Sequence, residues 1–162
     1  MKTLLLIRHA KSSRDERALP DAERPLTERG RRDAAELAKR LAKRALKADL
    51  ILSSPARRAV ATARIVANGL AYRRRDIALD ERLYACDAGE LLRIIRQLDD
   101  RCQQVALFGH NPQLTALAHR LAPSIIHMST CALATFEFAA KSWSRVGRAT
   151  LASAVLDSRK KT

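Results

Sequence analysis

The stretch that decides the fold of this 162-residue chain is Leu4-Leu5-Leu6-Ile7-Arg8-His9-Ala10-Lys11. Its four consecutive aliphatic residues are typical of a strand that is buried on both faces, as in a parallel sheet. Open α/β sheets bind their ligands at the carboxyl ends of such strands. Here that end carries an arginine and a histidine side by side. The stretch therefore predicts an α/β protein with a charged site at the end of its first strand.

The composition is that of one folded domain. Hydrophobic residues make up 47% of the chain, enough for a single core. We expect the domain to span residues 1–157 and a short basic tail to span 158–162. No apolar run is long enough to cross a membrane and no signal peptide is recognisable, so we expect a cytoplasmic protein without a membrane partner. The cysteines are scattered without metal-ligand spacing and are expected to be reduced thiols.

The chain is strongly basic, with a formal net charge of +14. Such a balance is found in proteins that bind nucleic acids, acidic membranes or anionic substrates. Much of the charge falls in residues 29–47, where an apolar stripe at helical spacing leaves the basic residues on the other face. A solvated helix face explains this pattern better than a binding patch. Because aromatic residues are only 4% of the chain, a nucleic-acid partner is poorly supported.

Predicted strands and helices alternate along the chain. Strands are expected over 3–8, 49–53, 72–78 and 105–109, and two further strands over 132–138 and 146–155. Helices are expected from Thr27 to about 46, from Ser54-Pro55 to about 68, over 88–98, and from Asn111-Pro112 to about 121. This alternation predicts a three-layer α/β sandwich in which helices flank a mainly parallel sheet.

Three of these strands deliver functional side chains to their carboxyl ends. Arg8-His9 ends the first, Ser54-Pro55 with two following arginines ends the second, and Gly109-His110 ends the fourth. In a parallel sheet these ends lie at one edge. Two helix amino termini would point their free amides at the same region, which favours an anion.

In order and spacing, four motifs resemble those of the histidine phosphatase superfamily, which has the phosphoglycerate mutase-like fold. They are Arg8-His9, Arg24-Pro25-Leu26-Thr27, Ser54-Pro55 with Arg58-Ala59, and Gly109-His110. The short chain and its Arg-Pro-Leu-Thr segment are most similar to the small SixA-type phosphohistidine phosphatase branch. The resemblance covers about residues 3–115.

The resemblance implies a role for each matching residue. His9 corresponds to the nucleophile that becomes transiently phosphorylated, and Arg8 and Arg58 to arginines that bind the phosphoryl oxygens. His110 corresponds to the second histidine of the phosphate pocket, and Arg24 to an arginine near it. The family spacing selects Arg58 over its neighbour Arg57, which we expect at the surface.

These roles agree with the chemistry of phosphoryl transfer. A nucleophilic histidine must be neutral, and nearby arginines lower its pKa by charge repulsion. Arginine forks stabilise the charge on the transferred oxygens. No metal-ligand spacing appears, so we expect neither a metal nor another cofactor.

The motifs assign no residue to the role of proton donor for the leaving group. Glu81 and Asp80 lie in about the right region, although a surface turn explains them equally well. A missing donor would hinder esters with poor leaving groups more than a phosphoramidate. We therefore expect a phosphatase with a phosphohistidine intermediate, acting on a phosphohistidine-carrying protein or a small phosphorylated substrate. The alternatives are a small-molecule phosphate-ester phosphatase and a non-catalytic module that binds anions or nucleic acid. His119 and His127 match no motif.

Overall fold

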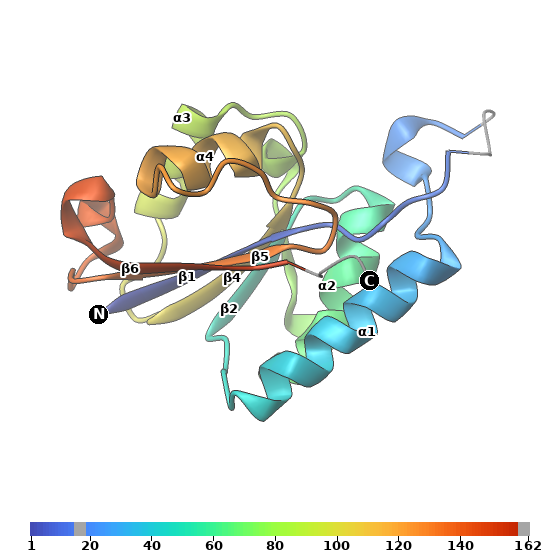
Figure 1. Ribbon diagram of the computed structural model, residues 1–162, viewed down its shortest axis with the longest axis horizontal. Coiled ribbons are helices and arrows are strands. Elements are labelled where there is room, and N and C mark those ends of the chain that lie inside the picture. The colour runs from blue at the N-terminus through green and yellow to red at the C-terminus, as the bar shows by residue number, and fades with distance from the viewer. Residues whose placement is uncertain (15–18, 159–162) are drawn as a thin grey trace.

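A six-stranded mixed sheet forms the centre of the molecule, with its strands in the order β3-β2-β4-β1-β5-β6 (Figure 1). The computed structural model describes residues 1–14 and 19–158. The parallel strands are β1 (Lys2–Arg8), β2 (Leu50–Ser53), β3 (Ala78–Leu79) and β4 (Gln104–Gly109). Strands β5 (Leu133–Phe138) and β6 (Leu151–Asp157) extend the sheet in antiparallel pairing.

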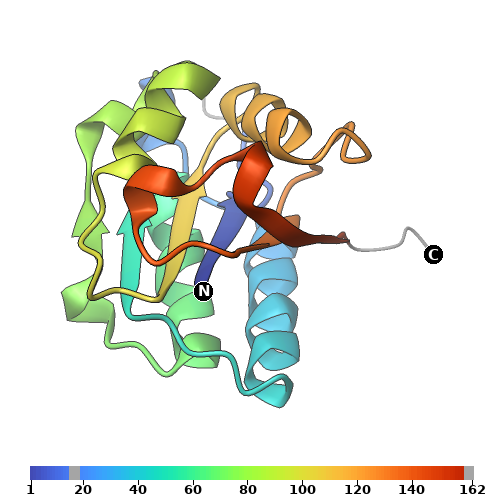
Figure 2. The same cartoon turned by 90° about the vertical axis from the view of Figure 1, so that its left-hand side faces the viewer.

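Two layers of helices cover the sheet, as Figures 1 and 2 show from directions at right angles. Helices α1 (Glu28–Lys43) and α2 (Arg57–Ala67) lie on one face, and α3 (Ala88–Arg96) and α4 (Gln113–Leu121) on the other. Strand β1 packs on both: Leu4 and Leu6 join the core under α3 and α4, whereas Leu5 and Ile7 join the core under α1 and α2. The predicted three-layer α/β sandwich with a doubly buried first strand is confirmed.

The amino terminus of α1 is fixed as the sequence indicates. The Thr27 hydroxyl caps it by accepting a hydrogen bond from the Gly30 amide at 2.9 Å. Gly30 lies so close to the preceding loop that a Cβ there would be 2.2 Å from the Lys11 carbonyl oxygen. The helix ends at Lys43, short of the predicted 46, and Ala45 then adopts a left-handed φ of 53°.

Helices α2 and α4 begin slightly later than the predicted starts at Ser54-Pro55 and Asn111-Pro112. Helix α2 begins at Arg57 with Ala56 as its N-cap, because Ser54 accepts the Ala56 amide within the preceding turn. Helix α4 begins at Gln113. The side-chain oxygen of Asn111 accepts hydrogen bonds from the amide and the hydroxyl of Thr115, within the helix.

Two predicted strands begin later in the structure than the sequence indicates. The segment 72–78 contains a 3-10 turn over Arg74–Asp76, and only Ala78–Leu79 pairs with β2. The strand predicted over 146–155 starts only at Leu151, because 3-10 turns occupy Trp143–Arg145 and Arg148–Thr150. In both places, local turn hydrogen bonds replace pairing near the rim of the sheet.

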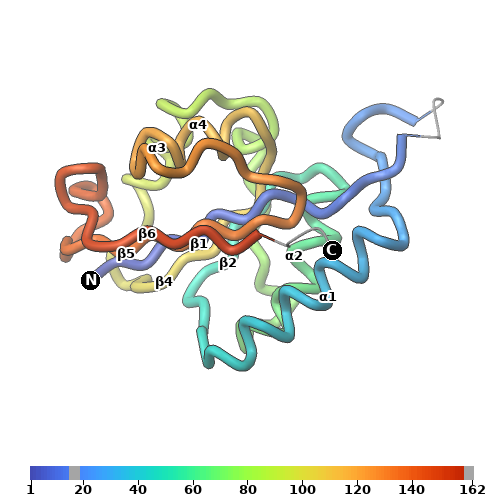
Figure 3. The backbone as a smooth tube through the Cα atoms, viewed as in Figure 1, coloured from blue at the N-terminus to red at the C-terminus, as the bar shows by residue number. Residues whose placement is uncertain are grey.

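Figure 3 shows the path of the backbone from β1 outward beyond the end of the sheet and back into α1. This excursion carries residues 9–14 and 19–27 past the strand ends. The basic tail residues Arg159-Lys160-Lys161 fall outside the described residues. Among those that are described, no helix combines the length and the apolar character needed to span a membrane.

Candidate active site

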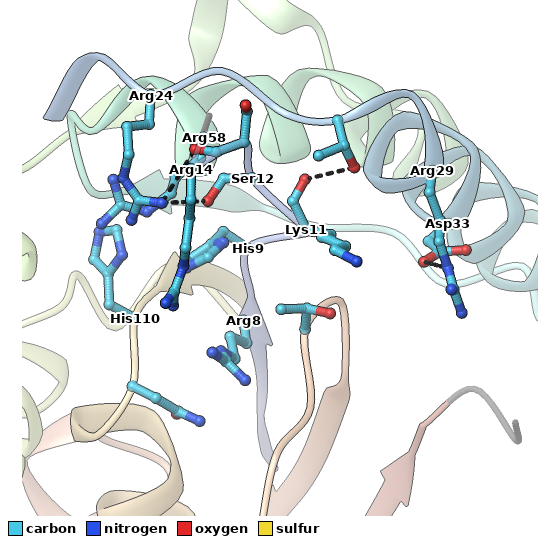
Figure 4. A pocket seen from close by; sticks show the side chains of 14 residues that line it. Arg8, His9, Lys11, Ser12, Arg14, Arg24, Arg29, Asp33, Arg58 and His110 are labelled. Carbon is cyan, nitrogen blue, oxygen red and sulfur yellow. Dashed lines mark hydrogen bonds and ion pairs between the residues drawn. The ribbon is translucent and has the colours of Figure 1, made fainter. Parts of the chain in front are cut away.

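A pocket of about 800 Å³ opens at the carboxyl edge of the sheet, where β1, β2 and β4 end (Figure 4). Its lining includes the five residues that the sequence assigned to binding and catalysis: Arg8, His9, Arg24, Arg58 and His110. They come from four separate segments of the chain. The convergence follows from the strand register, because the His9 amide bonds the Gly109 carbonyl and the Ser54 amide bonds the Phe108 carbonyl.

His9 has a defined tautomer when it is neutral. Its Nδ1 lies 2.7 Å from the Ala10 carbonyl oxygen. A carbonyl oxygen can only accept, so Nδ1 carries the proton and donates it. The lone pair of the neutral ring is therefore on Nε2. Burial lowers the pKa of His9 to about 4, with the charges of Arg58 and Arg8 acting in the same direction.

His110 lies beside His9, with ring centroids 5.2 Å apart. Its Nε2 is 2.8 Å from the hydroxyl oxygen of Ser54, which is fully buried and also accepts the Ala56 amide. Of the atoms in these contacts, only Nε2 of His110 can accept a hydrogen bond from the Ser54 hydroxyl. The neutral His110 ring then carries its own proton on Nδ1, which makes no hydrogen bond to the described residues. Burial, followed by the proximity of His9, lowers the pKa of His110 to about 3.

Arg58 is held by a residue that the sequence did not single out. Its Nη1 donates to the Asp21 carbonyl oxygen at 2.7 Å and its Nη2 to the Asp21 carboxylate at 3.0 Å. The Arg58 side chain is only 7% exposed, so the Asp21 carboxylate compensates a nearly buried charge. Thr62 ties Arg58 to the first strand end, since its hydroxyl donates to the Arg58 carbonyl and accepts the Ala10 amide.

Asp21 also joins two further side chains. Arg24 pairs with its other carboxylate oxygen, at 2.9 Å from Nη2. The Tyr84 hydroxyl donates to the oxygen that binds Arg58, and the Tyr84 ring meets His110 edge-on at 5.6 Å. These contacts, first that of Tyr84 and then that of Arg58, hold the pKa of Asp21 well below its usual range. The spacing of Asp21 three residues before Arg24 was the one sequence signal for this pair.

Arg8 lines the pocket from the end of β1. Its Nη1 donates to the Met128 carbonyl oxygen at 3.1 Å, and Asn111 donates to the same oxygen. Its Nε is buried and makes no hydrogen bond to the described residues. Arg8 is therefore oriented by backbone and carries no carboxylate partner within the described chain.

The residues considered for the proton donor lie outside the pocket lining. The Asp80 carboxylate accepts from Arg82 at 2.7 Å, and this contact lowers the pKa of Asp80. Glu81 is exposed. A donor role for either residue stays a prediction without a contact in the pocket to support it.

The remaining candidates lie elsewhere. Arg57 is exposed, and so are His119 and His127; none of the three lines the pocket. All three cysteines are free thiols outside the lining, and burial raises the pKa of Cys131 to about 12, which makes it a poor nucleophile. Within the described residues, no group of three or more histidine, cysteine or acidic side chains is arranged to hold a metal ion.

The fold and this pocket define an α/β protein with two buried histidines and three arginines at the carboxyl edge of its sheet. The chain belongs to the histidine phosphatase superfamily (branch 1), whose family model matches residues 4–104. No curated protein matches the chain significantly.

Similar solved structures carry the same fold. One is assigned as the phosphohistidine phosphatase SixA of Nakamurella multipartitia, with a TM-score of 0.83, 21% identity, and coverage of 97% of this chain and 95% of the other. Another is assigned as SixA of Agrobacterium tumefaciens, with a TM-score of 0.77, 27% identity, and coverage of 85% and 92%. A third is a protein histidine phosphatase SixA complexed with tungstate, with a TM-score of 0.76, 21% identity, and coverage of 96% and 94%.

Proposed function

We propose that this protein is a phosphatase in which Nε2 of His9 receives the phosphoryl group, and that its substrate is phosphohistidine in a protein. The observation that carries the proposal is the hydrogen bond from Nδ1 of His9 to the Ala10 carbonyl oxygen, because it leaves Nε2 as the nucleophile. The low pKa of His9, about 4, keeps that nitrogen unprotonated at neutral pH.

In the first step, Nε2 of His9 attacks phosphorus while the bond to the leaving group breaks and its electron pair stays on the leaving atom. His9 keeps its Nδ1 proton, so the phosphorylated ring is cationic and remains bonded to the Ala10 carbonyl. In the second step, water attacks phosphorus and the N–P bond breaks. This returns neutral His9 and releases inorganic phosphate and a proton.

Arg8, Arg58 and His110 would stabilise the charge on the transferred oxygens. The position of the three side chains supports this role, because Arg8, Arg58 and His110 all line the pocket that contains His9. A tetrahedral oxyanion has the acceptors that such donors need. Tungstate is an oxyanion of this shape, and it is the ligand of the similar SixA structure.

Two observations support phosphohistidine over a phosphate ester. No carboxylic acid approaches His9 among the described lining residues, where the only acidic group is Asp33, paired with Arg29. A phosphoimidazole that is protonated on its other nitrogen departs as neutral imidazole, so it needs no proton from the enzyme. The similar solved structures include three SixA proteins, at 21–27% identity.

Trapping the phosphoenzyme tests the nucleophile. Wild-type protein quenched during turnover should carry acid-labile, alkali-stable phosphate, and His9→Ala should carry none and lose turnover. His119→Ala, a change at an exposed histidine outside the pocket, is the matched control and should behave as wild type. Normal turnover in a folded His9→Ala variant would overturn the mechanism.

A substrate panel tests the substrate class. Phosphohistidine protein should be hydrolysed with a higher kcat/KM than aryl phosphates or sugar phosphates, and EDTA should leave the rate unchanged. A preference for esters would favour the small-molecule phosphatase. Salt-dependent DNA binding without hydrolysis would favour the non-catalytic module.

A further inference from the structure

The pocket extends beyond the phosphate site onto a basic rim made by residues 11–14. Lys11 and Arg14 line the pocket and are exposed, so they lie at its mouth. In the view of Figure 4, the Arg14 side chain lies between His110 and His9, and Lys11 lies on the other side of His9, toward Arg29 of α1. The proposed chemistry at His9 assigns no role to this rim.

The rim carries positive charge that no acidic side chain among residues 1–14 and 19–158 balances. Arg24 and Arg58 share the Asp21 carboxylate, and Arg29 has Asp33 at 3.9 Å. By contrast, Lys11 and Arg14 form no ion pair with any described residue. Burial, and after it the charge of the nearby Arg14, lowers the pKa of the Arg8 guanidinium. The two cations therefore add to a positive field that is already present at Arg8.

The rim is held in place by the start of α1. The Lys11 carbonyl accepts the Thr27 amide at 2.9 Å, and the Ser13 amide donates to the Pro25 carbonyl at 2.9 Å. An isolated antiparallel bridge pairs Ser12 with Leu26. The backbone of residues 11–13 is thus fixed; it carries Lys11 and directly precedes Arg14.

One phosphoryl group cannot use all of this charge, because it carries at most two negative charges, which fall among Arg8, Arg58 and the two histidines. A ligand that compensates Lys11 and Arg14 must bring further anions outside the reacting centre. We propose that Lys11 and Arg14 bind acidic side chains that flank the phosphohistidine of a protein substrate, an inference that rests on the proposed function. Aspartates and glutamates beside the phosphorylated residue would reach an exposed rim while the phosphoryl group enters the pocket.

Two synthetic phosphohistidine peptides of equal length test this inference. One carries glutamates on both sides of the phosphohistidine and the other carries glutamines. Each exposed ion pair contributes a factor of about two to five, so wild type should prefer the acidic peptide about tenfold in kcat/KM, mainly through KM. Lys11→Gln and Arg14→Gln should each lower this selectivity two- to fivefold by the same estimate, and the double variant should remove it.

Arg32→Gln is the matched control, because Arg32 is exposed on α1 outside the pocket lining and its loss should leave the selectivity at the wild-type value. Raising the salt concentration should reduce the preference of wild type. Equal kcat/KM for the two peptides, or full selectivity in the double variant, would overturn the role of the rim while leaving hydrolysis at His9 intact. Failure to hydrolyse either peptide, with rapid hydrolysis of esters, would instead overturn the proposed substrate class and this inference with it. Selectivity for a small bisphosphate together with no peptide preference would reassign the rim to a small-molecule anion and also overturn the inference.

Discussion

Acidification from pH 7 to pH 5 should destabilise the folded protein through the two pocket histidines. His9 and His110 are 8% and 5% exposed, and burial lowers their pKa values to about 4 and about 3. In the unfolded chain, both return to an ordinary pKa of about 6.5. Because the unfolded chain then binds more protons than the folded protein in the window from about pH 6.5 to pH 4, stability falls as the pH falls through it.

The magnitude follows from the same values. At pH 5 both folded rings are still neutral and both unfolded rings are almost fully protonated, so each histidine lowers the free energy of unfolding by about 2 kcal/mol relative to pH 7. The result depends little on the folded pKa values, because both lie well below pH 5. The expected total is about 4 kcal/mol, a large part of the stability of a domain of this size.

Urea unfolding at pH 7 and at pH 5 measures this loss, with the fluorescence of the fully buried Trp143 as the probe. His9→Gln should lose about half as much stability as wild type between the two pH values, whereas His119→Gln should lose as much as wild type. A wild-type loss below about 1 kcal/mol, or an unchanged loss in His9→Gln, would refute the assignment of neutral, buried rings.

Three further substitutions test single contacts. Arg58→Ala should lower kcat by about 10²–10³, as loss of one transition-state donor does, and exposed Arg57→Ala should not; equal losses would contradict the assignment. Ser54→Ala should lower kcat about tenfold with little change in KM, because it removes the hydroxyl that sets the His110 tautomer; an unchanged kcat would reject that role. Gly30→Ala should cost about 1–3 kcal/mol of stability, since its Cβ would meet a backbone carbonyl oxygen, and an unchanged Tm would contradict the contact.

Much of the site was predictable because a parallel sheet places its carboxyl strand ends at one edge. Arg8-His9 and Gly109-His110 end neighbouring strands, and their convergence needed only the alternation of strands and helices. Arg58 followed from the resemblance, whose spacing selects it over Arg57 at the start of α2. The predicted strand bounds were wrong near the rim of the sheet. There, local turns compete with strand pairing, and the hydrophobic periodicity of the sequence carries little information.

Asp21 and Tyr84 could not be found in the same way. They are 63 residues apart, each in a short 3-10 turn, and only the folded chain brings the Tyr84 hydroxyl to the Asp21 carboxylate. Residues in such connecting segments leave no periodic pattern in the sequence. Electrostatics offered one hint of an acidic residue such as Asp21, since an arginine that is buried beside a histidine requires a counter-charge.

The Asp21 contact also determines how Arg58 would meet a phosphoryl group. Asp21 accepts one hydrogen bond from each terminal nitrogen of Arg58, through its carbonyl and its carboxylate, so each of these nitrogens keeps one N–H that this contact does not use. Arg8 is likewise oriented through Nη1, which donates to the Met128 carbonyl oxygen. A phosphoryl group in transfer spreads its charge over three equatorial oxygens, and guanidinium groups of fixed orientation stabilise that charge without reorganisation. Replacing Asp21 would free Arg58 to rotate and would disturb that orientation without removing any group that touches the substrate.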